Sequence, residues 1–297
     1  MRQTETSVAT AMGDMRAVVY HPDSDGPLPG IVLVDGAGDS AADDWGAQPA
    51  TFGGCGAVIL THDKPGCGGS PGDWRDQTLA DRARDSLAAL EVLRHQPGVD
   101  PDRVGFLGIS QGGWVSYLAA SMAPRAVRHV VTISGAGVSP AEQERYRIAC
   151  DVDGDEEALA WVDERTRRLL AGEDPASVSA SQRAYADRPW YAGACEHYVP
   201  EMLPFFVRIA GFDPAAVFPE VRCPVFAAFG GADTSVPTRP SVAVLNDLLP
   251  SDPRHAIAVY PDVGHGLLPA GYDRAIPYSA KLAPGFLAML TEWLTTR

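Results

Sequence analysis

The segment Gly108-Ile109-Ser110-Gln111-Gly112-Gly113 lies in the middle of the chain, between two runs of different character. The apolar run 103–107 before it predicts a β-strand, and the run 114–122 after it predicts a helix. Glycines on both sides of Ser110 suit a place where strand and helix nearly touch, because a side chain there would clash. A Gly-x-Ser-x-Gly in this context predicts a tight turn that raises a nucleophilic serine above a sheet. An ordinary glycine-rich loop is the alternative.

Strand-like and helix-like runs alternate on both sides of this turn. We expect strands at 6–10, 16–20, 30–34, 56–61, 103–107, 127–133, 225–229 and 255–260. Helices are expected at 41–52, 79–93 (with Thr78 as N-cap), 114–122, 239–249 and 281–294. This alternation predicts the α/β class, with a mostly parallel sheet covered by helices on both faces.

The alternation stops after Ser134 and resumes near residue 222. Ser139-Pro140-Ala141-Glu142 has the form of a capping box with proline at the first helical position, and a second helix is expected over 155–170. Residues 173–222 look irregular and rich in aromatic residues. We therefore expect an α/β core at 1–137 and 222–297, with a mostly helical lid insertion at 138–221 above the carboxyl edge of the sheet.

Composition excludes several classes of function. The 297 residues are 45% hydrophobic and 21% charged, with a net charge of −14, which argues against nucleic acid or an anionic membrane as a partner. No run is long enough for a membrane span, and the N-terminus has no apolar signal core. The five cysteines have no metal spacing, so we expect reduced thiols, a cytoplasmic protein, no metal and no cofactor. A small-molecule substrate is the expected partner, and a homodimer is left open.

A serine nucleophile needs a base, and the base needs a group that orients it. His265 follows the last strand within Asp262-Val263-Gly264-His265-Gly266, where flanking glycines let the backbone present the ring. The other six histidines have ordinary structural readings: His21, His62, His95, His129, His197 and His255. Asp233 also follows a strand and is the expected partner of His265, with Asp262 as its rival.

Acyl transfer also requires donors for a developing oxyanion. The N–H of Gln111, at the start of the helix after Ser110, is one candidate. The loop Asp35-Gly36-Ala37-Gly38-Asp39 after strand 30–34 has small side chains, and Ala37 N–H is the second candidate. A plain glycine turn is the alternative reading of this loop.

These residues together resemble the α/β-hydrolase superfamily. The resemblance rests on the chain order Ser110, Asp233, His265, on Gly230-x-x-Asp233-x-x-Val236-Pro237, and on Gly264-His265. The turn Asp63-Lys64-Pro65-Gly66-Cys67-Gly68-Gly69-Ser70 is similar to the Asp-x-x-Gly-x-Gly-x-Ser turn of that superfamily. The similarity covers about 14–137 and 222–297 and is greatest to peptidase-like and dienelactone-hydrolase-like esterases. It implies the α/β-hydrolase fold and a serine nucleophile.

The sequence thus predicts a serine hydrolase that cleaves an ester or thioester of a small, mostly apolar molecule through an acyl-Ser110 intermediate. Asp35 departs from the His-Gly of many relatives, and an anionic side chain facing the oxyanion would oppose its charge. The alternatives are an acyltransferase, or a lyase or cyclase in which His265 transfers protons and Asp35 takes part. Aromatic residues of the lid are candidates for the substrate pocket, or else form the lid's own core: Trp190, Tyr191, Tyr198, Phe205 and Phe206.

Overall fold

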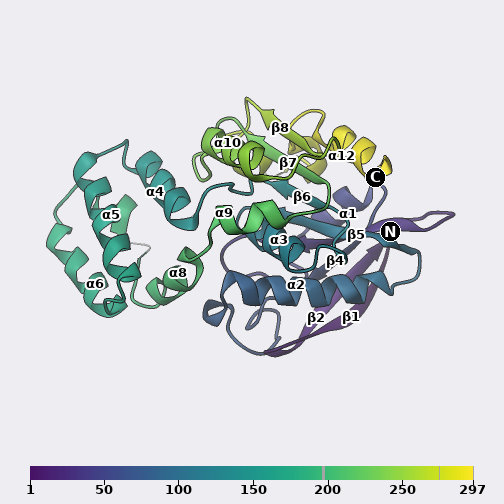
Figure 1. Cartoon of the computed structure of the whole chain (residues 1–297), viewed down its shortest axis with the longest axis horizontal. Coiled ribbons are helices and arrows are strands. Elements are labelled where there is room, and N and C mark those ends of the chain that lie inside the picture. The colour runs from purple at the N-terminus through teal and green to yellow at the C-terminus, as the bar shows by residue number, and fades with distance from the viewer. Residues whose placement is uncertain (196–197, 274, 297) are drawn as a thin grey trace.

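A computed structural model describes residues 1–195, 198–273 and 275–296. One eight-stranded sheet with helices on both faces dominates it (Figure 1). The strands are β1 (Arg2–Thr10), β2 (Gly13–His21), β3 (Leu28–Val34), β4 (Val58–His62), β5 (Val99–Ile109), β6 (Val130–Ile133), β7 (Val225–Gly230) and β8 (Ala256–Tyr260). His197, assigned above to the insertion, lies outside the described residues.

The strand order is β1-β2-β4-β3-β5-β6-β7-β8. Strand β2 pairs antiparallel with both β1 and β4, and β3 to β8 are parallel to one another. The chain passes from β3 outward to β4 and then returns to β5 on the other side of β3. The loops after β3 and β5 therefore leave the sheet at a topological switch point, where open α/β sheets place their ligands.

The helices are α1 (Gln48–Gly53), α2 (Leu79–Arg94), α3 (Gln111–Met122), α4 (Pro140–Asp151), α5 (Glu156–Leu170), α6 (Pro175–Gln182), α7 (Tyr191–Cys195), α8 (Leu203–Ala210), α9 (Pro214–Val217), α10 (Thr238–Leu248), α11 (Tyr278–Lys281) and α12 (Phe286–Thr295). Short 3₁₀ turns occupy Trp74–Asp76, Arg183–Tyr185, Phe218–Glu220 and His265–Leu267.

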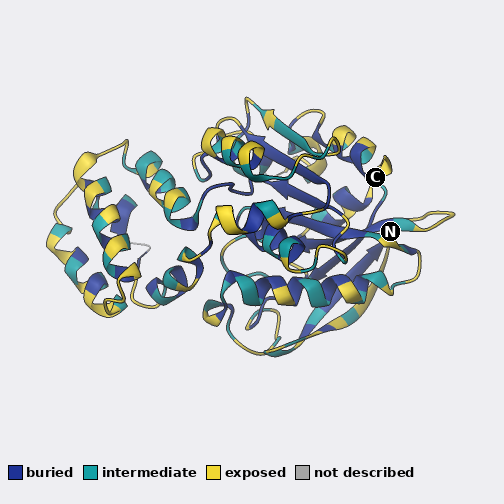
Figure 2. Cartoon of the chain, in the orientation of Figure 1, coloured by how far each residue is buried: buried dark blue, intermediate teal, exposed yellow. Residues whose placement is uncertain are grey.

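Successive residues of a strand pack alternately into two separate hydrophobic cores, one on each face of the sheet. Val32 and Val34 of β3 pack with α2 and α3 on one face of the sheet. Ile31 and Leu33 pack with α1 and α12 on the other face. The parallel strands are accordingly apolar on both sides, and they form the buried centre of the molecule (Figure 2).

The predicted helix starts are confirmed in detail. Thr78 caps α2 through a capping box with Asp81, and Ser139 caps α4 through a capping box with Glu142. The Asp155 side chain accepts the Ala158 N–H at the start of α5. Each cap satisfies amide groups that a helix start leaves without an intrahelical partner.

Three sequence expectations are corrected. Residues 173–222 look irregular in sequence but contain α6 to α9 and two 3₁₀ turns. These helices are short, and α6, α8 and α9 have a proline in their first turn, so the sequence shows no helical periodicity there. The expected helix 41–52 is confined to Gln48–Gly53. The expected helix 281–294 is split into α11 and α12, because Pro284 cannot continue a helix and Gly285 takes a φ of 85°.

The segment between β6 and β7 has a hydrophobic core of its own. Helices α4, α5, α6 and α8 lie to one side of the sheet in Figure 1. Trp161, Val162, Leu169 and Leu203 are among the buried residues of this core. Its outer helix surfaces are exposed, as Figure 2 shows.

Within the described residues, none of the helices combines the length and the apolar character that a membrane crossing requires.

Candidate active site

Ser110 occupies a sharp bend between β5 and α3. Its backbone has φ 55° and ψ −122°, a region that a non-glycine residue enters only at an energetic cost. An added Cβ at Gly108 would overlap the Gly112 carbonyl, and one at Gly112 would overlap the carbonyl oxygen of Val34. The Ser110 N–H is held by Ile133 O at 3.0 Å. Both glycines are therefore needed for the close passage that sets Ser110 in its strained conformation.

Asp233 and His265 are brought together by the loops after β7 and β8. The Nδ1 atom of His265 lies 3.0 Å from Oδ2 and 3.2 Å from Oδ1 of Asp233. The Asp233 side chain is fully buried, and its Oδ1 also accepts the N–H groups of Ser235 and Val236 at 2.8 and 2.9 Å. Burial opposes ionisation of Asp233, but His265 and the two amides hold its pKa below the usual value. The carboxylate is thus ionised and aimed at one ring nitrogen.

The backbone on either side fixes this histidine. Gly266 takes a φ of 70°, and its N–H donates to Ser134 Oγ at 3.1 Å. Ser134 follows β6, is buried and has a φ of 51°. Sequence reasoning missed Ser134, because its contact with Gly266 spans 132 positions of the chain.

Ser110 and His265 line one cavity of about 400 Å³. Within the described ranges they are not joined by a hydrogen bond, although both face this space. Catalytic hydrogen bonds are often long without substrate and tighten when it binds.

The two candidate oxyanion donors lie beside Ser110. Ala37 and Gln111 both line the same cavity. As the first residue of α3, Gln111 has an N–H with no intrahelical acceptor, and the helix N-terminus adds a partial positive charge. An added Cβ at Gly36 would lie 3.3 Å from Ser110 Cβ, so the loop after β3 passes close to the serine.

Asp35 is the first residue of this loop, and it is not among the residues that line the cavity containing Ser110. Its carboxylate contacts Lys64 Nζ at 2.9 Å and Arg82 Nη2 at 2.7 Å. Burial opposes ionisation, but these two cations hold the pKa of Asp35 below its usual value. The prediction that Asp35 binds substrate stays a prediction; in this structure its carboxylate is paired with two buried cations.

Lys64 and Arg82 bind the surrounding backbone as well. Lys64 Nζ donates to Gly36 O at 2.7 Å and to Gly38 O at 2.6 Å. Arg82 donates to Asp35 O at 3.0 Å and to the side chain of Gln111. The two cations thus tie the loop after β3 to the start of α3, which carry the two candidate oxyanion donors. Sequence reasoning missed both roles.

Helices α4 and α8 supply most of the cavity wall opposite Ser110. Tyr198, Phe205 and Phe206 line it, and their role in substrate binding stays a prediction. Trp190 and Tyr191 are not among its lining residues and pack within the core of the helical segment, where the ring centroids of Trp190 and Tyr185 lie 5.2 Å apart. The apolar wall is completed by Trp114, Pro140, Met202 and Ile209.

A polar group interrupts this wall. Glu144 Oε1 and Arg147 Nη2 of α4 form an ion pair of 2.8 Å, and both residues line the cavity. Gln143 Nε2 donates to Ser235 O at 2.7 Å, and the Tyr146 hydroxyl donates to Asp233 O at 2.8 Å. Helix α4 therefore contacts the loop that holds Asp233. Sequence reasoning treated these residues only as part of a capped helix.

Within the part of the chain that the structure describes, no group of three or more His, Cys, Asp or Glu side chains is arranged to hold a metal ion.

Two family models match the chain in sequence. The X-Pro dipeptidyl-peptidase (S15 family) model matches residues 13–202, and the dienelactone hydrolase family model matches residues 199–297. No curated protein matches the chain at a significant level. The first model covers more than half of the chain and contains Ser110, whereas the second contains Asp233 and His265.

Solved structures show the same fold at low identity. The α/β hydrolase GrgF from Penicillium sp. sh18 is 14% identical, with a TM-score of 0.65 over 100% of this chain and 99% of that one. Est1E from Butyrivibrio proteoclasticus, solved with ferulic acid, is 18% identical, with a TM-score of 0.59 over 98% and 96%. The 2,6-dihydroxy-pseudo-oxynicotine hydrolase is 17% identical, with a TM-score of 0.59; the match covers 98% of this chain and 66% of that one.

Proposed function

The chain belongs to the X-Pro dipeptidyl-peptidase (S15) family and is an α/β-hydrolase of the peptidase-like and dienelactone-hydrolase-like type, and from this premise we propose that it is a serine hydrolase with Ser110 as nucleophile. One observation carries the proposal. Ser110 and His265 line the same cavity while the second ring nitrogen of His265 is bound to buried Asp233.

The proposed reaction begins with His265 taking the proton of Ser110 Oγ as that oxygen attacks the substrate carbonyl. Asp233 fixes the tautomer of His265 and stabilises the imidazolium. The N–H groups of Ala37 and Gln111 bind the oxyanion of the tetrahedral intermediate. His265 then protonates the leaving group, whose bond to the tetrahedral carbon breaks to give acyl-Ser110. His265 later takes a proton from the water that hydrolyses this acyl-enzyme.

We propose an ester or thioester of a small, mostly apolar molecule as substrate. The cavity of about 400 Å³ falls within the range of small-molecule sites, and aromatic and aliphatic side chains form most of its wall. The Glu144–Arg147 pair offers hydrogen bonds to a polar group on the substrate.

The pairing of Asp35 supports hydrolysis over the lyase or cyclase alternative. That alternative gave Asp35 a part in proton transfer, whereas Lys64 and Arg82 neutralise it away from the cavity. An acyltransferase would use the same acyl-enzyme and differs only in the acceptor.

We further propose that residues 138–221 act as a lid on a core formed by 1–137 and 222–297. Helices α4 and α8 contribute Glu144, Phe205 and Phe206 to the cavity that contains Ser110. The separate core of this segment supports the idea of a unit that moves as one body.

Labelling with a fluorophosphonate tests the nucleophile. The wild-type chain and Ser121→Ala, a matched control on the same helix, should be labelled once per chain at Ser110, whereas Ser110→Ala should not be labelled. Turnover of p-nitrophenyl esters of increasing acyl length, of a matching thioester, and of an X-Pro-p-nitroanilide then separates esterase from peptidase activity. Adding an alcohol or amine acceptor separates hydrolase from transferase. Full turnover by Ser110→Ala would overturn the proposal.

A further inference from the structure

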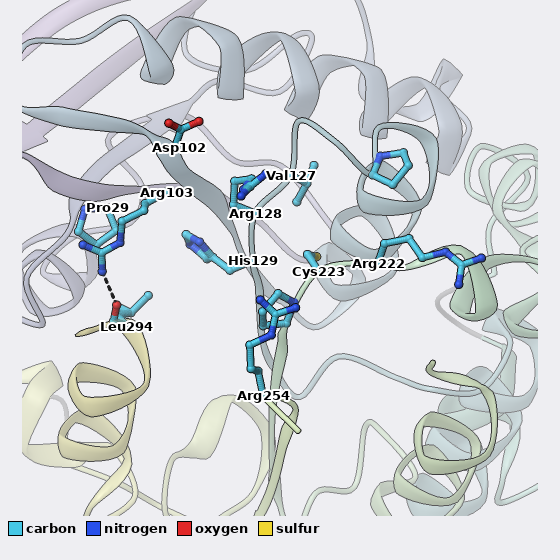
Figure 3. Close-up of a pocket in the computed structure, with 12 residues that line it drawn as sticks. Pro29, Asp102, Arg103, Val127, Arg128, His129, Arg222, Cys223, Arg254 and Leu294 are labelled. Atoms are coloured by element: carbon cyan, nitrogen blue, oxygen red, sulfur yellow. Dashed lines mark hydrogen bonds between the residues drawn. The ribbon is translucent and has the colours of Figure 1, made fainter. Parts of the chain in front are cut away.

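The parallel strands β5 to β8 have a cavity at each end, and the two cavities differ in how their side chains are arranged. The cavity at the amino ends has a volume of about 220 Å³ (Figure 3). Its arginine side chains do not converge, because Arg103 extends toward Leu294 while Arg222 is directed away from it (Figure 3). Side chains from separate segments converge instead at the carboxyl ends of these strands, around the loop that holds Asp233.

Helix α4 of the inserted segment binds this loop through two hydrogen bonds. The Tyr146 hydroxyl donates to the backbone oxygen of Asp233 at 2.8 Å, and Gln143 Nε2 donates to that of Ser235 at 2.7 Å. These bonds join residues 87 and 92 positions apart, so they connect the insertion with the core. They hold the same turn whose Ser235 and Val236 N–H groups bind the carboxylate of Asp233.

The residues that lead into α4 are themselves fixed to the core. The backbone oxygen of Val138 accepts the indole N–H of Trp114 at 3.0 Å. An added Cβ at Gly137 would overlap the backbone oxygen of Ser241, so the chain passes closely over α10 at this point. Ser139 then starts α4 with its capping box. The helix therefore reaches the Asp233 loop from a fixed starting point.

Tyr146 differs in its surroundings from its neighbours on α4. Gln143, Glu144 and Arg147 line the cavity that contains Ser110, whereas Tyr146 is not among its lining residues. Burial first, and then the neighbouring Cys150, raise the pKa of Tyr146 to about 12. The hydroxyl is therefore protonated at neutral pH and can donate to Asp233. Tyr146 can thus influence the reaction through the Asp233 loop without touching the substrate.

We propose that Tyr146 is a positioning residue, which holds the backbone of Asp233 so that the carboxylate meets Nδ1 of His265. The inference rests on the proposed function, in which Asp233 orients His265 for the attack by Ser110. Both carboxylate oxygens lie within hydrogen-bond distance of Nδ1, at 3.0 and 3.2 Å. A displacement of the loop by about 1 Å would break this alignment, and misplacement on that scale can cost about 10²-fold in rate. The insertion thereby supports the catalytic acid in addition to forming a wall of the pocket.

The variant Tyr146→Phe tests this role, because it removes the hydroxyl group and keeps the ring. We expect kcat for the best p-nitrophenyl ester to fall roughly tenfold with little change in KM, since the loop shifts while the cavity lining stays the same. The rate of fluorophosphonate labelling at Ser110 should fall by the same factor, because labelling also needs an aligned His265. The matched control is Tyr185→Phe in the same segment, which keeps its ring contact with Trp161 and should leave both rates at the wild-type value.

The Asp233→Asn background separates positioning from a merely structural contribution. If Tyr146 acts through Asp233, adding Tyr146→Phe to Asp233→Asn should change the labelling rate by less than about twofold, because effects that share one route do not add. An unchanged labelling rate in Tyr146→Phe, or the same tenfold loss in both backgrounds, would overturn the proposal. A wild-type chain that is not labelled at Ser110 would refute the proposed function itself, and this inference with it.

Discussion

The ammonium group of Lys64 lies 2.9 Å from the carboxylate of Asp35, and the two side chains are 3% and 15% exposed. The same ammonium group binds the carbonyl oxygens of Gly36 and Gly38, on either side of Ala37. A buried ion pair therefore supports the loop that offers one of the proposed oxyanion donors. Asp35, which stands where many relatives carry histidine, therefore supplies the carboxylate that binds Lys64 next to the site.

Replacing Lys64 should impair catalysis by loosening this loop. Lys64→Met removes the two hydrogen bonds to the backbone on either side of Ala37, and it leaves Asp35 paired with Arg82 alone. We expect kcat to fall by roughly 10- to 100-fold, less than the 10²- to 10³-fold loss typical of removing an oxyanion donor itself. Steady-state kinetics on the best ester would measure this, with circular dichroism as the check on folding.

The chain's other lysine provides the control. Lys281 Nζ lies 4.7 Å from the centroid of the Tyr272 ring, and Lys281 does not line the cavity that contains Ser110, so Lys281→Met should keep wild-type kcat. A Lys64→Met enzyme with unchanged kcat and normal fold would show that the ion pair has no positioning role.

The same lysine predicts how stability changes with pH. Burial, with repulsion from Arg82, lowers the pKa of Lys64 from 10.5 to about 8, although Asp35 opposes this. Between these two values the unfolded chain binds more protons at Lys64 than the folded chain does, so this group makes the free energy of unfolding rise with pH. Urea unfolding at several pH values should give the wild-type chain and Lys281→Met the same pH dependence, in which Lys64 contributes this rise and the buried cysteines, whose pKa values are raised, contribute a fall. The rise should be smaller in Lys64→Met, and identical curves would contradict the shifted pKa.

Removing the charge of Asp233 should affect both activity and acid stability. Asp233→Asn keeps the shape but cannot fix the His265 tautomer, so kcat should fall by about 10³- to 10⁴-fold. The folded-state pKa of Asp233 lies below its unfolded value. The interaction therefore stabilises the fold above about pH 4 and is lost as the pH falls through the folded-state pKa. The stability difference between wild type and Asp233→Asn should shrink over that acidic range, and a difference independent of pH would refute the assignment.

Local patterns predicted the parts of the fold that depend on neighbours in sequence. The caps at Thr78 and Ser139, the parallel strands and the bend at Ser110 each follow from residues a few positions apart. The chain order of Ser110, Asp233 and His265 fits the sheet because each residue follows a strand whose carboxyl end lies at one edge.

Such local patterns could not predict contacts between residues that are far apart in the sequence. Arg82 and Lys64 looked like ordinary charges on a helix and in a turn, yet both are buried against Asp35. Trp190 and Tyr191 could not be separated from Tyr198 and Phe205 by composition, because only tertiary packing decides which aromatic residues face the cavity.

The close contact between Gly112 and the end of β3 predicts that adding one methyl group at this position will strongly lower the free energy of unfolding. In Gly112→Ala the new Cβ would overlap the backbone oxygens of Val34 and Asp35, which cannot move without shifting β3. We expect a loss of about 3 kcal/mol or more in the free energy of unfolding, at or above the usual range for overpacking. Gly211→Ala is the matched control, because no atom lies within 4 Å of its added Cβ and its φ is −77°. Equal stability of the two variants would show that the bend is not tightly packed.

The lid proposal predicts that a residue of the 138–221 segment controls substrate size. Met202 lines the cavity from the turn before α8 and is only partly buried, so Met202→Trp should fill part of the 400 Å³. We expect kcat/KM for the longest accepted acyl chain to fall roughly tenfold or more, since a misplaced substrate loses binding and orientation together, while short esters keep their rates. Met289→Trp, at an exposed position of α12, serves as the control and should leave the acyl-length profile unchanged. If Met202→Trp lowered kcat/KM equally for all acyl lengths, the residue would affect the fold or the motion of the segment and not the size of the pocket.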